Sequence, residues 1–102
     1  MESVRLLSVI QSFRDASTLS FWNTGKSKGM PPANLRRAAL RKLQMLDGAA
    51  TLEDLRVPPG NRLEALTGDR KGQHSIRIND QFRICFVWKD SNAFDVEITD
   101  YH

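Results

Sequence analysis

The last three residues of the sequence, Asp100, Tyr101 and His102, carry side chains that can move protons or bear charge. They follow residues 93–98, in which large apolar side chains recur at every second position, the pattern of a half-buried strand. A strand that runs into Asp100 would tie the following residues to a sheet. The sequence therefore predicts an acid–base site at this end, with an ordinary surface terminus as the alternative.

Two further segments, residues 73–78 and 82–88, alternate apolar and polar side chains in the same way. A two-residue turn between them would mix the two faces of the hairpin. A three-residue loop, residues 79–81, instead aligns Ile76 with Ile84 on one face. Burial favours the three-residue loop, because a slip by one residue would turn every side chain to the other face.

This register predicts that Arg77 lies opposite Arg83 on the face away from the core. Like charges opposed across strands are destabilising, by roughly 0.2–1 kcal/mol. The arginine pair is therefore expected to bind an anion. Arginine matches a phosphate group in a bidentate way, and Tyr101 shares the parity of the two arginines. The anion could instead be internal, because Asp95, Glu97 and Thr99 have the matching polar parity on the last strand.

Composition limits the class of protein. The chain has 102 residues and a net charge of +3, and we expect one domain over residues 1–102. It has neither a long apolar run nor a secretory signal, so we expect no membrane span and a cytoplasmic location. The single cysteine, Cys85, fits a reducing compartment and is expected to be a small sheet residue. With two histidines and one cysteine there is no metal-ligand spacing.

Two helices are expected before the sheet. Residues 15–24 form the first, which Gly25 ends in a left-handed conformation. Residues 35–46 form the second, with an apolar stripe on one side and four cations on the other: Arg36, Arg37, Arg41 and Lys42. The basic side is either an ordinary solvated face or a surface for phosphate or an acidic partner. Residues 7–13 are compatible with an additional strand.

The motifs of the second half, taken together and in order, resemble the HigB toxins of the RelE/ParE superfamily. They are Arg62-Leu63-Glu64-Ala65-Leu66-Thr67-Gly68-Asp69-Arg70-Lys71-Gly72, then Ser75-Ile76-Arg77-Ile78-Asn79, then Phe82-Arg83-Ile84, and finally Asp100-Tyr101-His102. The short helix that ends at Gly25 resembles the start of the family. The resemblance covers the last forty residues most strongly.

The resemblance implies an α+β fold in which two N-terminal helices pack on a curved, mainly antiparallel β-sheet. It also implies a toxin of a type II toxin–antitoxin pair that cuts mRNA in the ribosomal A site without a metal or cofactor. The implied partners are the ribosome, mRNA and a HigA-like antitoxin with a helix-turn-helix domain, through which the complex would bind operator DNA. Residues 1–9 extend beyond the expected start of the family, as an added strand, a tail or a start-site choice.

The resemblance also assigns roles to residues. Asp100, Tyr101 and His102 match the family's C-terminal motif, and Arg83 matches its strand arginine, which would stabilise the charge on the phosphate. Glu64 stands where some relatives have histidine, so it is either a substitute base or a solvated glutamate. Thr67 stands where a lysine is frequent, and the residues expected to compensate are Arg62, Arg70 and Lys71. Arg77 is a further RNA-binding candidate.

Two other functions remain open from the sequence. ParE-type relatives poison DNA gyrase and are not nucleases, but a protein that only binds has no need of Tyr101 and His102. The chain could also be an inactive toxin that is retained as an antitoxin-binding module, which the departures at Glu64 and Thr67 would allow.

Overall fold

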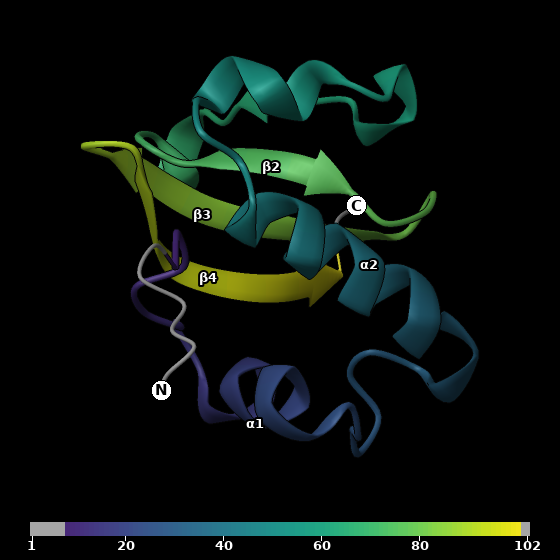
Figure 1. The fold of residues 1–102 in the computed structure, drawn as a ribbon. Coiled ribbons are helices and arrows are strands. Elements are labelled where there is room, and N and C mark those ends of the chain that lie inside the picture. Colours follow the sequence, from purple (N-terminus) through teal and green to yellow (C-terminus); the bar gives the residue numbers. More distant parts are fainter. Residues whose placement is uncertain (1–7, 101–102) are drawn as a thin grey trace.

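The structure is a computed structural model that describes residues 8–100. Two α-helices precede a four-stranded antiparallel sheet of order β1-β2-β3-β4 (Figure 1). The elements are α1 Ala16–Thr24, α2 Arg36–Asp47, β1 Glu64–Ala65, β2 His74–Arg77, β3 Phe82–Lys89 and β4 Asn92–Asp100. Four 3₁₀ helices lie between them, at Ala33–Leu35, Leu52–Arg56, Pro59–Asn61 and Gly68–Arg70. The expected order of two helices followed by an antiparallel sheet is confirmed.

The first helix has the ends that the sequence predicts. Asp15 precedes α1 and its carboxylate accepts a hydrogen bond from the backbone N–H of Thr18 at 3.1 Å, which satisfies one of the open N–H groups of the first turn. Gly25 follows the helix with a φ of 75° and donates its N–H to the carbonyl of Phe21. Phe21 is fully buried and Trp22 packs against the core, so α1 is held by its caps and by these two aromatic side chains.

The second helix covers the apolar face of the sheet. Ala39, Leu43 and Leu46 on α2 are fully buried, and they belong to one core cluster with Ile84 and Phe86 of β3. In Figure 1, α2 lies across the sheet while α1 lies beyond β4. The predicted apolar stripe therefore packs into the core that α2 shares with the sheet. None of the helices within residues 8–100 is long and apolar enough to cross a membrane.

The β2–β3 hairpin has the predicted three-residue loop, residues 79–81. Asn79 Oδ1 accepts hydrogen bonds from the backbone N–H groups of Gln81 at 2.9 Å and Phe82 at 2.7 Å, which fixes the loop. The resulting register pairs Ile76 with Ile84, and the adjacent residues Arg77 and Arg83 with each other. The hairpin therefore sends its isoleucines into the core and its arginines to the other face.

The β3–β4 hairpin determines which residues of the two strands lie opposite each other. Asp90 and Ser91 both have positive φ, 53° and 64°, as a two-residue turn between twisted strands requires. A bulge at Asp95, with φ of 53°, shifts the register between Cys85 and Val87. Beyond the bulge, the first residue of β3 lies opposite Asp100, the last of β4.

The segment before α1 joins the sheet. Ile10 and Phe13 form parallel bridges with Ala93 and Val96 of β4, so residues 9–14 cover the outer edge of that strand. The carbonyl of Val9 accepts the N–H of Ala93 at 2.9 Å. The suggested strand over residues 7–13 is therefore not formed in its described part, where two isolated bridges attach the segment to β4. The expectation of an extension over residues 1–9 falls largely on residues 1–7, which lie outside the described residues.

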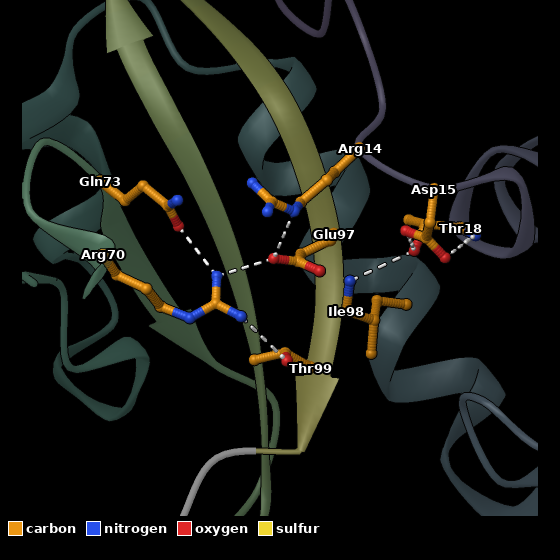
Figure 2. Close-up of polar contacts among 8 residues, drawn as sticks. All are labelled: Arg14, Asp15, Thr18, Arg70, Gln73, Glu97, Ile98 and Thr99. Atoms are coloured by element: carbon orange, nitrogen blue, oxygen red, sulfur yellow. Dashed lines mark hydrogen bonds and ion pairs between the residues drawn. The ribbon is translucent and has the colours of Figure 1, made fainter.

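Thr18 ties α1 to the sheet, because its buried hydroxyl donates to Asp15 at 2.7 Å and accepts the N–H of Ile98 at 3.3 Å (Figure 2). We expect Thr18→Val to lower the free energy of unfolding by about 1–3 kcal/mol, because it leaves a buried N–H without its partner. Urea unfolding would measure this. The matched control is Thr67→Val, since the exposed Thr67 makes no side-chain cap bond and should change stability by less than about 0.5 kcal/mol. Equal losses in both variants would contradict the assigned role of Thr18.

Candidate functional site

A small hollow opens at the end of the sheet where β2 ends and β3 begins. Its volume is about 210 Å³. It is lined by three cations, an amide and a carboxylate: Arg62, Arg77, Arg83, Asn79 and Asp80. Three arginines that line one hollow make it a candidate anion site, since a guanidinium can contact a phosphate in a bidentate way. The predicted opposition of Arg77 and Arg83 is what creates this site.

Arg83 is the buried member of the three, with 7% of the residue exposed. Its Nη1 donates to Glu64 Oε1 at 2.6 Å and to Ser75 Oγ at 3.1 Å, and its Nη2 donates to the carbonyl oxygen of Arg62 at 3.2 Å. These contacts hold the guanidinium in one orientation. In the backbone register Arg83 faces Thr99, but the carboxylate that its guanidinium contacts is that of Glu64.

The other two arginines are less constrained. Arg77 Nη2 pairs with Asp80 Oδ1 within the hairpin, and 30% of the Arg77 side chain is exposed. Arg62 follows the 3₁₀ helix Pro59–Asn61 in a left-handed conformation, with φ of 47°. The exposed Arg62 thereby presents its carbonyl to Arg83 while also lining the hollow.

The C-terminal motif begins beside this site. Asp100 is exposed at the end of β4, opposite Phe82, and its Oδ2 accepts a hydrogen bond from Gln81 Nε2 at 3.0 Å. The carboxylate therefore lies next to the loop that contributes Asn79 and Asp80 to the hollow. Tyr101 and His102, the other two predicted catalytic residues, lie outside the described residues.

Two predicted RNA-binding residues, Arg70 and Lys71, lie in the loop before β2 and differ in their contacts. Arg70 Nη1 donates to Glu97 Oε1 at 2.7 Å and to Gln73 Oε1 at 3.0 Å, so the side chain reaches across the sheet (Figure 2). Its Nη2 lies 3.4 Å from Thr99 Oγ1. Lys71 is exposed. Arg70 thus holds the loop against the sheet face opposite α2, whereas Lys71 is open to a partner.

Two polar residues of the sheet are structural. Cys85 is fully buried, and this burial raises the pKa of its thiol above the ordinary value, with Glu97 acting in the same direction against Arg70 and Arg83. Such a thiol is a poor nucleophile at neutral pH, as the sequence predicts. His74 stacks on Phe86 with ring centroids 6.3 Å apart, which agrees with a packed histidine.

The four cations on the basic side of α2 differ in their contacts. Arg36 donates from Nε to Ser27 Oγ at 2.9 Å, and Lys42 donates to Asn61 Oδ1. Partial burial, followed by the charge of Arg41, lowers the pKa of Lys42. Arg37 and Arg41 are exposed and have no ion-pair partner in the described part of the chain. Only part of the basic side is therefore available to another molecule.

Three contributors to the hollow or to its support escaped sequence reasoning: Ser75, Asn79 and Asp80. Ser75 is fully buried against Arg83 and shares the polar parity of the two arginines, so the alternation contained a signal for it. The sequence pattern places Asn79 and Asp80 in the turn and predicts no role for either in the site. Within residues 8–100, histidine, cysteine, aspartate and glutamate form no cluster of three that could hold a metal ion.

Comparison with known families decides what kind of chain this is. A family model described as "RelE-like toxin of type II toxin-antitoxin system HigB" matches residues 11–102. The chain belongs to the HigB-like toxin family. The matched range contains every predicted site residue of this HigB-like chain.

Individual relatives agree with this assignment. The chain is 42% identical over 83 residues to Toxin HigB-1 of Vibrio cholerae, which covers 81% of this chain and 87% of the relative. It is 30% identical over 94 residues to Endoribonuclease HigB of Proteus vulgaris, which covers 92% of this chain and 100% of the relative. The solved YoeB-YefM complex from Staphylococcus aureus matches the fold with a TM-score of 0.57 at 14% identity, covering 91% of this chain and 97% of that one.

The Arg70–Glu97 pair is partly buried, with 31% and 14% of the two side chains exposed. In this HigB-like chain we expect Arg70→Ala to lower the free energy of unfolding by about 1–3 kcal/mol, because a shielded carboxylate loses a charged hydrogen bond. Lys71→Ala is the matched control and should stay within about 0.5 kcal/mol of wild type. Urea unfolding of both variants would test this, and equal midpoints would show that the Arg70 contact contributes nothing to stability.

Proposed function

We propose that this HigB-like chain is the toxin of a type II pair and a ribosome-dependent endoribonuclease that cleaves translated mRNA in the A site without a metal. The observation that carries the proposal is the hollow in which buried Arg83 meets Arg62 and Arg77 beside Asp100. A hollow lined by cations and adjacent to groups that transfer protons is suited to bind and cleave an RNA phosphodiester. The name of the Proteus vulgaris relative, Endoribonuclease HigB, supports the same chemistry.

The proposed reaction is transfer of a phosphodiester within the RNA. A base removes the proton of the ribose 2′-hydroxyl, and the resulting O2′ attacks the adjacent phosphorus in line with the leaving 5′-oxygen. The bond to the 5′-oxygen breaks, that oxygen takes up a proton, and the products carry a 2′,3′-cyclic phosphate and a 5′-hydroxyl. The negative charge on the phosphate grows along this path, so a fixed cation lowers the barrier.

The proposed roles follow the position of each residue. Arg83 stabilises the charge on the phosphate, since its contacts with Glu64 and Ser75 fix its orientation before RNA arrives. His102 or Asp100 handles the protons, and Tyr101 positions the substrate or assists. Glu64 stands beside Arg83 with half of its side chain exposed, which keeps it a candidate base.

The proposed RNA contacts and partners follow from charge and family. Arg62 and Arg77 line the hollow and Lys71 is exposed, so these three would bind flanking phosphates, while Arg70 would do so only in addition to its Glu97 contact. A HigA-like antitoxin would neutralise the toxin in the cytoplasm and bind operator DNA on behalf of the complex. The Staphylococcus aureus structure is a complex of two named components, YoeB and YefM, which supports a bound partner.

One observation favours a second function. The carboxylate of Glu64 lies 2.6 Å from Arg83 Nη1, where an incoming phosphate would compete with it. If that pair does not open, the chain would bind its antitoxin but cut no RNA. Toxicity on expression distinguishes the two functions, because the nuclease would arrest growth and the inactive module would not.

Arg83→Gln should lower the single-turnover rate of mRNA cleavage on programmed ribosomes by about 10²–10³, because the lost charge matters most in the transition state. Ribosome affinity should fall far less. Arg41→Gln, which removes an exposed cation from α2, is the matched control and should leave the rate near that of wild type. Circular dichroism would confirm that each variant is folded. Parallel losses of rate and affinity in Arg83→Gln would make Arg83 a positioning contact only.

The proposal as a whole is tested by inducing wild type and His102→Gln in cells while following growth and mapping mRNA 5′ ends. We expect growth arrest with cuts inside translated codons for wild type, and neither for His102→Gln, although it binds antitoxin normally. Arrest without such cuts would move the function to a gyrase-poisoning toxin. Absence of arrest in wild type would favour the inactive binding module.

A further inference from the structure

Both arginines that face each other across the β2–β3 hairpin are paired with a carboxylate of the same chain. Arg83 pairs with Glu64 and Arg77 pairs with Asp80. The two like charges are therefore tolerated because each has its own counter-charge. A phosphodiester that enters the hollow therefore competes with an internal carboxylate for each of these two arginines.

The two pairs differ in how readily they can open. The Arg83 side chain is 9% exposed and that of Glu64 is 49% exposed, so separating this pair would leave a shielded guanidinium without that carboxylate. The Asp80 side chain is 94% exposed, and 30% of the Arg77 side chain is exposed. Water can solvate Asp80 fully once it is released, and exposed pairs of this kind contribute little. Exchange is therefore much easier at Arg77 than at Arg83.

We propose that Asp80 is an exchangeable internal carboxylate that holds Arg77 at the rim of the hollow and is displaced from it by an RNA phosphate. This inference rests on the proposed function and adds a residue that sets RNA affinity. Asp80 lines the hollow itself, and the loop that carries it is fixed by Asn79. Its carboxylate therefore competes with a phosphate for Arg77 at the rim of the hollow.

If Asp80 exchanges with a phosphate, the effect of substituting Asp80 on RNA affinity must depend on Arg77. Asp80→Asn keeps the shape of the side chain but removes its charge, so Arg77 becomes available to phosphate without competition. In a background that lacks the Arg77 guanidinium, the same substitution has no pair to release. The effect of Asp80→Asn on RNA affinity should therefore vanish in Arg77→Ala, which a general change in net charge would not produce.

The test is a double-mutant cycle on binding of a single-stranded 2′-O-methyl RNA oligonucleotide, which the proposed reaction cannot cleave. Fluorescence anisotropy at low salt would give Kd for wild type, Asp80→Asn, Arg77→Ala and the double variant. The control is Asp90→Asn, because Asp90 is also exposed in a hairpin turn but at the opposite end of β3. We expect Asp80→Asn to lower Kd about two- to fivefold in the wild-type background, with no change in the Arg77→Ala background or for Asp90→Asn.

Three results would overturn the inference: an unchanged Kd in Asp80→Asn, an equal gain in the Arg77→Ala background, or no binding of the oligonucleotide by wild type. The proposed nuclease function is decided separately, by mRNA cleavage on ribosomes with the same wild-type preparation. Cleavage of mRNA together with a double-mutant cycle that shows no coupling between Asp80 and Arg77 would overturn only the proposed role of Asp80. Coupling between Asp80 and Arg77 in RNA affinity, without cleavage of mRNA, would show that the hollow binds RNA but is not an active site.

Discussion

The register of the β2–β3 hairpin is the constraint on which the proposed site depends. Ile76 and Ile84 must share the buried face, and strands alternate their faces at every residue, so Arg77 and Arg83 necessarily lie opposite each other on the other face. Burial of apolar surface in the core thus offsets the repulsion between two cations. The three-residue loop closed by Asn79 fixes this register. A slip by one residue would turn one strand's isoleucine away from the core and its arginine away from the proposed site.

Three arginines on or beside this sheet face are paired with carboxylates of the same chain. Glu64 of β1 reaches Arg83, Asp80 of the hairpin reaches Arg77, and Glu97 of β4 reaches Arg70. The Arg70–Glu97 pair holds the loop before β2 against the sheet, and the Arg83–Glu64 pair is harder to open than the exposed Arg77–Asp80 pair. The exposed pair is available for exchange. A single sheet face can therefore be stable in the absence of RNA and still present cations to a phosphate.

Much of the fold could be predicted from local patterns, and the parts that could not depend on contacts distant in sequence. Asp15 and Gly25 mark the ends of α1 by their chemistry, and the alternation around Ile76 and Ile84 determines the hairpin register. The partner of Arg83 was not predictable, because Glu64 belongs to a strand of only two residues whose position depends on the 3₁₀ helices before it. The contact of Arg70 with Glu97 was missed as well, since the path of its loop depends on positive φ angles at Gly68 and Gly72. Sequence reasoning thus located the cations and left their counter-charges open.

Arginine side-chain NMR would show most directly whether the hollow binds a phosphodiester. The Nε–Hε resonances of Arg62, Arg77 and Arg83 would be followed while a 2′-O-methyl RNA oligonucleotide is added, with Arg37 and Arg41 on α2 as internal references. Binding in the hollow predicts saturable shifts of the first three resonances at one common Kd, with the two references nearly unmoved. Shifts confined to Arg37 and Arg41 would contradict it, because the RNA would then bind the basic side of α2 and the arginine hollow would have no part in its recognition.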